Sequence, residues 1–370
     1  MGVKAKVISA IIFSVIGLGA VATVVYVWHM QNQVPEPTTP VPETTTVDPH
    51  AGKVQNYLNG KWQDPKVNKK RPIAVMYNNI EAAIPHYGIS YADVNYEIPV
   101  EGTITRIMAI FQNYHSLKRM GSVRSCRIYF ARASLEWDSI YVHYGQSKYA
   151  KKFLRSKKID NVCAYNAGNY FYRTNDKPAP HNCYTSGKLI NKAVKKLRYK
   201  WKHKMKYKGT VKFVEDGKAK LPDSKEALTV KTGYTYNHAY YKYNKKNGQY
   251  YRYQYGKKHI DKKNNSQLHC SNIIFQFVKW KIFPDHKSLN IKQTGKGKGW
   301  FITNGKATKI TWEKKRKNGI THYYYPNGEE IKLNTGKTWI NLIYNKDKKD
   351  VKIIGSKKKK SKKQKETEKI

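Results

Sequence analysis

Residues 104–111 read Ile-Thr-Arg-Ile-Met-Ala-Ile-Phe, a run that is apolar on both alternating faces except at Thr105 and Arg106. A shorter run from Ile73 to Tyr77 has the same character. A strand that is apolar on both faces is covered on both sides, as in the middle of an α/β sheet. The two runs therefore predict buried strands with other elements packed on each face.

The segments around these strands alternate between helical and extended composition. We expect helices over 124–137 and 147–155, separated by a strand over 140–143. A third helix is expected to begin near Ser186, because apolar residues follow it at spacings close to 3.6. The first half of the chain is therefore predicted to be α/β.

After about Thr229 the sequence changes to runs of Tyr, Val, Ile, Thr and Trp, broken by Asn-Gly pairs that begin at residues 247, 304, 318 and 327. Asn-Gly tolerates positive φ at both central positions of a type I′ turn, which is a strong hairpin signal. The tyrosines between Tyr234 and Tyr255 are expected to be cross-strand partners, with stacking on sugars as the alternative. The fold class is thus predicted as mixed α+β: an N-terminal α/β domain followed by a smaller, mostly antiparallel β domain.

An apolar run from Val7 to Trp28 follows Lys4 and Lys6. At about 1.5 Å per residue it spans roughly 33 Å, enough for one transmembrane helix. Because the basic residues precede it, the globular part is expected outside the cell membrane, on a single-pass signal-anchor. Cleavage after the small-x-small segment 20–22 is the alternative. A lipoprotein signal is excluded, since no cysteine precedes Cys126.

Composition also divides the chain into segments. Low apolar content and like charge favour disorder at both ends of the globular part. The predicted segments are a membrane anchor over 1–30, a disordered Pro/Thr stalk over 31–56, an α/β domain over 57–205, a linker over 206–228, a β domain over 229–350 and a Lys-rich disordered tail over 351–370.

The formal charge is +46, from 71 Lys and Arg against 25 Asp and Glu. Outside a membrane, the polyanions that match this charge are wall polymers and lipid headgroups, so no nucleic acid partner is expected. Mutational bias is a competing explanation, because Lys, Asn, Tyr and Ile all have AT-rich codons. The four cysteines allow either two disulfides or buried thiols, and their spacing matches no metal or redox motif. We expect neither a metal nor a cofactor.

Arg106 interrupts an apolar strand, so its guanidinium is expected to be desolvated. A buried charge needs a counter-charge, which either Glu97 and Glu101 or a bound anion would supply. Arg124 and Arg127 open a predicted helix, where the helix dipole is already positive.

With Ser122 or Ser125 as N-cap, that helix start would suit a phosphate, sulfate or carboxylate ligand. The alternative is an internal carboxylate from Asp93, Glu97 or Glu101. His143 ends a strand and His181 lies in a loop, where α/β sheets place ligands, although a core histidine is the commoner outcome. The predicted ligand-binding residues are Asn78, Glu97, Glu101, Arg106, Arg124, Arg127, His143, Arg173, His181 and Asn182.

Blocks spread from about residue 58 to 342 resemble the YerB-like lipoproteins of Gram-positive bacteria, a domain of unknown function (number 3048) with N- and C-terminal domains. The blocks are RPIAVM (71–76), ADVNYEIPVEG (92–102), GSVRSCR (121–127), YVHYG (141–145), FYR (171–173), APHNCYT (179–185), YR (251–252), HID (259–261) and GKTWI (336–340). Ser122, Cys126 and Cys183 depart from the usual family residues. The resemblance implies an exported two-domain protein and carries no established activity.

Function is therefore predicted from the arginines. We expect a noncatalytic envelope protein that binds an anionic group in a cleft lined by Arg106, Arg124, Arg127 and His181. The alternatives are an envelope hydrolase or transferase with Glu97 or Glu101 as acid/base, and a scaffold for membrane proteins. In an extended segment these carboxylates lie about 13 Å apart, beyond the roughly 5 to 9.5 Å of glycosidase pairs.

Overall fold

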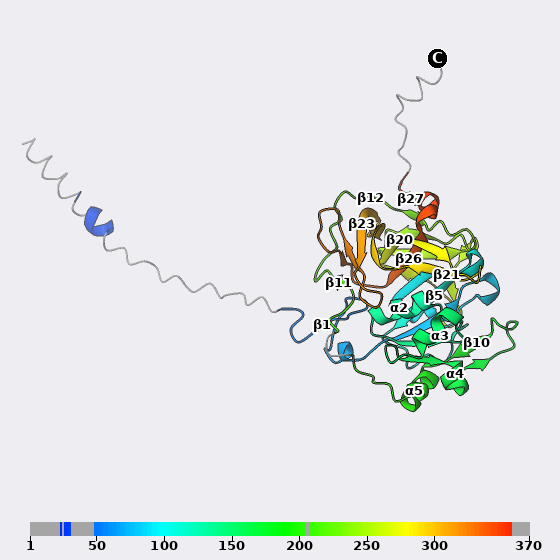
Figure 1. Ribbon diagram of the computed structural model, residues 1–370. Coiled ribbons are helices and arrows are strands. Elements are labelled where there is room, and N and C mark those ends of the chain that lie inside the picture. Colours follow the sequence, from blue (N-terminus) through cyan, green and yellow to red (C-terminus); the bar gives the residue numbers. More distant parts are fainter. Residues whose placement is uncertain (1–22, 24–25, 31–47, 204–206, 357–370) are drawn as a thin grey trace, which may run out of the picture. The chain divides into compact units, whose positions relative to one another are not determined.

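The computed structural model of the chain describes residues 23, 26–30, 48–203 and 207–356, in two units, Met1–Ala51 and Gly52–Ile370 (Figure 1). In the first unit, residues 23 and 26–30 are helical. Most of the predicted anchor helix over 7–28, residues 31–47 of the predicted stalk and the chain from residue 357 onward lie outside the described residues. Within the described part, no helix is long and apolar enough to cross a membrane.

The second unit is built on a twelve-stranded mixed sheet. Its strands lie in the order β12 (Lys225–Glu226), β23 (Lys306–Lys314), β22 (Gly295–Thr303), β20 (Asn272–Ile282), β26 (Thr338–Tyr344), β4 (Val94–Pro99), β5 (Thr105–Phe111), β3 (Ile73–Asn78), β7 (Ile140–His143) and β8 (Asn161–Cys163), with β21 (Leu289–Lys292) on β20 and β24 (His322–Tyr324) on β23.

The two halves of the sequence meet inside this sheet. Strand β26 pairs in parallel with β4, from Thr338 opposite Val94 to Asn341 opposite Glu97. Within the predicted linker, β11 (Lys212–Phe213) pairs with β25 (Lys332–Leu333), and β12 pairs with β23. One sheet therefore contains strands of both halves, and the division into two domains stays a prediction.

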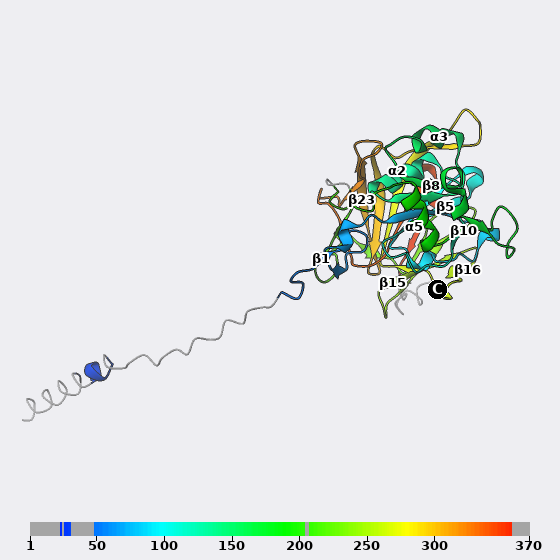
Figure 2. The same cartoon turned by 90° about the horizontal axis from the view of Figure 1, so that it is seen from below.

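Alternate residues of β3 face two different hydrophobic cores. Ile73, Val75 and Tyr77 belong to the core that contains apolar residues of α5 (Gly187–Lys196) and of a second sheet. Ala74 and Met76 belong to the core that contains residues of α2 (Ile128–Glu136) and α3 (Lys148–Leu154). All residues of β3 and β5 are buried, so the prediction of strands covered on both sides is confirmed (Figure 2).

The predicted helices are present, but the first begins later than expected. α3 starts after Ser147, and the Ser186 hydroxyl of α5 accepts a hydrogen bond from the Leu189 N–H. α2 begins at Ile128 rather than Arg124, and its N-cap is Arg127, so the prediction of Ser122 or Ser125 as N-cap is wrong.

The reason is that the backbone before α2 is hydrogen-bonded to other segments of the chain. Val123 and Arg124 donate their N–H groups to the carbonyls of Cys183 and Met76, and Cys126 donates to that of Gly145. These bonds hold the segment extended, so the helix cannot start there.

The second sheet has the order β16 (Lys257–Lys258), β15 (Gln249–Gln254), β14 (Tyr240–Asn244), β13 (Thr229–Lys231) and β27 (Lys352–Ile354), with β19 (His269–Cys270) on β15. The Asn-Gly pair at 247–248 joins β14 to β15, and the pair at 304–305 joins β22 to β23, as predicted. Tyr240 stacks on Tyr253 across strands, which confirms the cross-strand role. β27 lies within the segment expected to be a disordered tail.

Short elements complete the unit. They are β1 (Val54–Gln55), β2 (Trp62–Gln63), β6 (Met120–Gly121), β9 (Tyr172–Arg173), β10 (Cys183–Thr185), β17 (Ile260–Asp261), β18 (Ser266–Gln267), α4 (Ala164–Ala167) and the 3-10 helices η1 (Val67–Lys69), η2 (Glu81–Ala83), η3 (Ile89–Tyr91), η4 (Glu101–Thr103), η5 (Gly168–Tyr170) and η6 (Asn345–Asp350).

Candidate functional site

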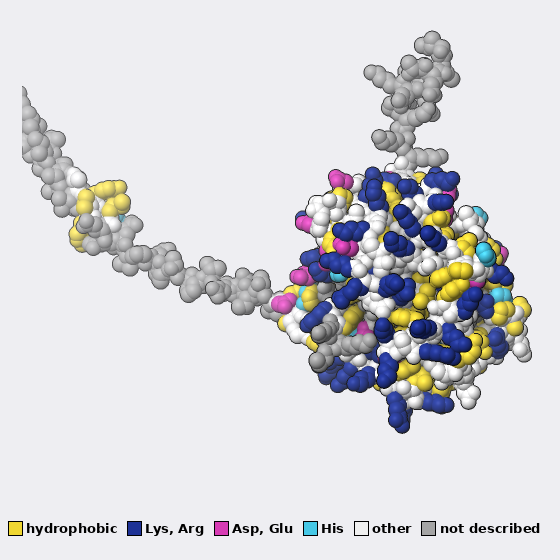
Figure 3. All heavy atoms as spheres, viewed as in Figure 1, with side chains coloured by type: hydrophobic (Ala, Val, Ile, Leu, Met, Phe, Trp, Pro, Cys, Tyr) yellow, Lys and Arg dark blue, Asp and Glu magenta, His cyan; other side chains and the backbone are white. Residues whose placement is uncertain are grey.

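Basic side chains cover much of the surface, and acidic side chains are few on the face shown in Figure 3. At the ends of β3 and β5 five such residues form what we call the basic cluster. Its members are Arg106, Arg124, Arg127, Arg173 and His181.

Arg106 is the buried member of the basic cluster. Only 4% of the residue is exposed, and its Nη1 donates to the Ser125 carbonyl at 2.6 Å. Its Nε is buried without a hydrogen-bond partner, and no described carboxylate forms an ion pair with it. Burial lowers the pKa of Arg106 to about 9, helped by the charges of Arg127 and Arg124. The guanidinium therefore remains charged at neutral pH without a direct counter-ion.

Arg127 has a carboxylate partner. Its Nε and Nη2 donate to the two oxygens of Glu101 at 2.7 and 2.6 Å. Burial raises the pKa of Glu101, but the hydrogen bonds and charge of Arg127 outweigh burial and lower it overall. The sequence alternative of an internal carboxylate is thus correct for Arg127.

Arg124 is less well satisfied. Its Nη1 lies 3.4 Å from the Pro180 carbonyl, and its Nε is buried without a hydrogen-bond partner. Burial lowers the pKa of Arg124, and the nearby charges of Arg127 and Arg173 lower it further. The four arginines of the basic cluster have one paired carboxylate, Glu101, among the described residues, which leaves three positive charges uncompensated.

The loop before β10 closes this side. Arg173 is exposed and donates to the Asn182 side-chain carbonyl at 2.7 Å, while the Asn182 amide donates to the Thr174 carbonyl. His181 Nδ1 lies 2.8 Å from the Asn78 amide nitrogen, so Nδ1 is the acceptor. Burial lowers the pKa of His181, as do the charges of Arg124 and Lys177. His181 is therefore neutral at pH 7.

A cavity of about 1000 Å³ borders the basic cluster at Ser125 and Arg127. Glu101 lines it on the same side, and Trp280, Asp285 and other residues line it elsewhere. Of the basic cluster, Arg127 lines this cavity, whereas Arg106, Arg124 and His181, with which we expected it to share a cleft, do not.

Glu97 lies elsewhere than predicted. It is 0% exposed, and its Oε2 accepts from Arg252 Nη2 at 2.6 Å, where we expected Arg106. Its Oε1 accepts from Asn79, Thr105 and Asn237. A buried carboxylate with both oxygens engaged cannot reach a substrate, so Glu97 is unsuited to acid/base chemistry.

A chain of hydrogen bonds connects this pair to the basic cluster. Arg252 can only donate, so its 2.5 Å contact fixes His259 Nδ1 as acceptor, and His259 Nε2–H then donates to His86 Nδ1 at 2.9 Å. His86 Nε2–H donates to the Asn78 carbonyl at 2.5 Å. Burial lowers the pKa of His86 to about 3 and that of His259 well below its usual value.

Asn78 is therefore shared: its carbonyl ends the buried chain and its amide binds His181 of the basic cluster. Residue-by-residue reasoning missed Arg252, His259 and His86. Arg252 and His259 do lie within the family-like sequence blocks 251–252 and 259–261, but those blocks alone indicate no role for them.

His143 is a core residue. It is 0% exposed, its Nδ1 contacts the Gly145 carbonyl at 2.8 Å and its Nε2 contacts the Asn161 side-chain carbonyl at 3.2 Å. Burial lowers its pKa to about 4. With both ring nitrogens engaged, His143 does not contact a ligand in this structure. All four cysteines are buried free thiols.

Fold and site together define a mixed, sheet-rich protein with few helices, a buried ion pair between its two halves and a basic cluster at one end of the sheet. Residues 58–200 match the family described as protein of unknown function (DUF3048) N-terminal domain, and residues 228–340 match its C-terminal domain. The chain belongs to this family.

Two similarities to individual proteins agree with that assignment. The chain is 33% identical over 298 residues to the "Putative lipoprotein YerB" of Bacillus subtilis (strain 168), covering 79% of this chain and 87% of the relative. It also resembles the crystal structure of the YerB protein from Bacillus subtilis, with a TM-score of 0.71 and 30% identity over 82% of this chain and 100% of the other. The fold is therefore similar to that of YerB.

Proposed function

We propose that the protein is a noncatalytic binding protein that holds an anionic group, such as a phosphate or carboxylate, at the basic cluster. The observation that carries this is Arg106, a residue that is 4% exposed, with a buried, unpartnered Nε and two neighbouring arginine charges. A buried cation without a counter-charge costs several kcal/mol, roughly, and an anion would remove that cost.

The neighbouring groups support the same ligand class. Arg124 also has an unpartnered Nε, and Arg173 is exposed beside it. Arginine forks bind carboxylate and phosphate oxygens in pairs, which lysine cannot do.

Titration of the full chain with inorganic phosphate, followed by calorimetry, tests the proposal. Arg124→Ala is expected to weaken binding by about tenfold or more, because a charge-assisted hydrogen bond contributes about 1.5–3 kcal/mol. Arg106→Met keeps the packing and is expected to abolish binding. The control is the double variant Arg198→Ala with Arg316→Ala, which changes two exposed arginines outside the cluster. It removes two positive charges, whereas each cluster variant removes one. Equal binding by wild type, Arg124→Ala and Arg106→Met would refute the proposal.

We also propose that the N-terminal segment holds the protein at the cytoplasmic membrane, with Gly52–Ile370 outside the cell. Support comes from the apolar run Val7–Trp28 after two lysines, and from the lipoprotein name of the Bacillus relative. The full chain is expected in the membrane fraction after carbonate washing, and a chain lacking residues 1–30 in the soluble fraction. Full-length protein in the carbonate supernatant would contradict the anchor.

A further inference from the structure

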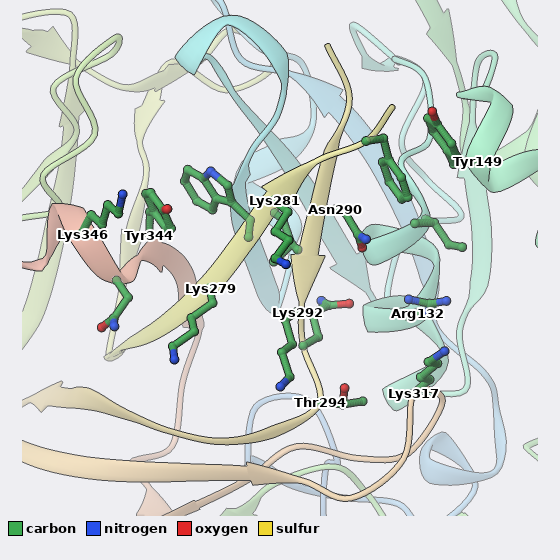
Figure 4. A pocket seen from close by; sticks show the side chains of 16 residues that line it. Arg132, Tyr149, Lys279, Lys281, Asn290, Lys292, Thr294, Lys317, Tyr344 and Lys346 are labelled. Atoms are coloured by element: carbon green, nitrogen blue, oxygen red, sulfur yellow. The ribbon is translucent and has the colours of Figure 1, made fainter. Parts of the chain in front are cut away.

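A second basic surface adjoins the cavity beside Arg127, and Trp280 lines both hollows. A groove of about 790 Å³ is lined by residues of α2, α3, β20, β21 and η6 (Figure 4). Six cations line it, and no Asp or Glu among the described residues does. These cations are Arg132, Lys279, Lys281, Lys292, Lys317 and Lys346.

Figure 4 shows how the cations surround this groove. Lys279 and Lys346 lie on one side, Arg132 and Lys317 lie on the other, and β20 and β21 run between them. Arg132 also has a buried Nε without a hydrogen-bond partner. Like charges at this density repel one another, so an anion that occupies the groove is stabilised by all of them.

The same groove contains two stacked aromatic pairs. Trp280 stacks on Tyr344 with ring centroids 3.9 Å apart, and Tyr149 stacks on Phe283 at 3.7 Å. All four rings are partly exposed and line the groove. In each pair one ring face is covered by the partner, so the pair offers a broad, rigid apolar surface.

The basic surface continues beyond this groove. A second hollow of about 630 Å³ shares Lys279, Lys292, Thr294 and Asn345 with it and extends along β22 and β23. It adds four lysines and again no acidic lining residue, although Glu313 pairs with one of them, Lys296, at 3.7 Å. The added lysines are Lys296, Lys298, Lys309 and Lys348. Together the hollows form one elongated basic groove with ten cations.

We propose that this elongated groove binds a phosphate-bearing glycan. Ammonium groups along its length would pair with successive phosphates, while the aromatic pairs would pack against sugar rings. Asn290, Gln293 and Asn345 also line the groove and offer amides for sugar hydroxyls. None of the basic cluster residues lines it, so this inference is independent of the proposed function.

Single-stranded nucleic acid is the rival polyanion. It is disfavoured because only Arg132 among the ten cations is an arginine, the cationic side chain that pairs with base edges and stacks on bases. The two polymers are therefore compared directly in the test.

The test measures binding of the full chain to three polymers of equal charge at several salt concentrations. They are glucosylated poly(glycerol phosphate), the same polymer without sugar, and an oligothymidylate. The glucosylated polymer is expected to bind about tenfold more tightly than the bare one, as one stacked ring contributes roughly that factor.

Two variants separate charge from stacking. Trp280→Leu keeps the apolar packing and is expected to abolish the preference for the glucosylated polymer, while Trp280→Phe restores part of it. Lys279→Gln with Lys292→Gln is expected to weaken binding of every polymer and to reduce the salt slope by about one to two. Tyr91→Leu, and Lys257→Gln with Lys258→Gln, are the matched controls outside the groove.

Each outcome of these measurements either supports or overturns the proposed binding of a phosphate-bearing glycan. A sugar preference that depends on Trp280 supports the proposal. Equal affinity for the two glycerol polymers, no effect of Trp280→Leu, or tightest binding of the oligothymidylate overturns it.

Discussion

The buried ion pair between Glu97 and Arg252 makes a strong prediction about stability. Both side chains are 0% exposed, and their oxygen and nitrogen lie 2.6 Å apart across β4 and β15. Glu97→Gln keeps the shape but leaves a buried guanidinium uncompensated, which costs about 3–5 kcal/mol. At roughly 2–4 °C per kcal/mol for a chain of this size class, the melting temperature should fall by about 10 °C.

Urea denaturation followed by tryptophan fluorescence measures the effect as a free energy of unfolding. Glu101→Gln is the matched control, because the Glu101–Arg127 pair is partly exposed, with 24% and 15% of the side chains accessible. We expect that control to cost about 1 kcal/mol or less. The double variant Glu97→Gln with Arg252→Met should recover much of the loss. Equal costs for Glu97→Gln and Glu101→Gln would show that the pair is not the buried contact described above.

Three further predictions concern other parts of the core. His143 is protonated near pH 6.5 when unfolded but only near pH 4 when folded, so it should lower the free energy of unfolding by about 1.4 kcal/mol for each unit that the pH falls between those values. His143→Gln should remove this share of the slope of stability against pH, while the buried His86 and His259 keep theirs. Without reductant, the denatured chain should show four reactive thiols and the native chain none, whereas two disulfides would give none in either state. A Cβ at Gly299 would lie 2.1 Å from the Phe275 carbonyl, so Gly299→Ala should cost more than about 2 kcal/mol in urea melts, while Gly168→Ala, with open space around it, should be close to neutral.

Local patterns in the sequence predict the strands and hairpins well. The double-faced apolar character of residues 104–111 requires cover on both sides, and β5 has it. Asn304-Gly305 demands positive φ at two successive residues, and the turn has φ of 50° and 73° there. In both cases the residues of one short segment are enough to predict its burial or its turn conformation.

The order of the strands in the sheet and the partners of buried side chains cannot be predicted from short segments of sequence. Nothing in β26 indicates that it lies beside β4, because parallel pairing has no turn signal. For the same reason the sequence does not indicate that Arg252, 155 residues from Glu97, is its partner, and it predicts nearby Arg106 instead. α2 begins later than the sequence predicts because backbone bonds to β3, β10 and the loop after β7 hold residues 123–126 extended.

The pairing of Glu97 with Arg252 rather than with Arg106 is what makes the basic cluster unusual. Had Glu97 paired with Arg106, a single ion pair at the end of β5 would have satisfied both groups. Glu97 pairs with Arg252 in the core, and both oxygens of Glu101 accept hydrogen bonds from Arg127. Neither of these carboxylates, which lie close to Arg106 in sequence, therefore pairs with Arg106. Arg106 keeps a backbone carbonyl as its acceptor, which compensates a hydrogen-bond donor but not a full charge. The core that joins the two halves of the chain therefore leaves an uncompensated positive charge at the start of β5, and in the function proposed above an external anion supplies the balance.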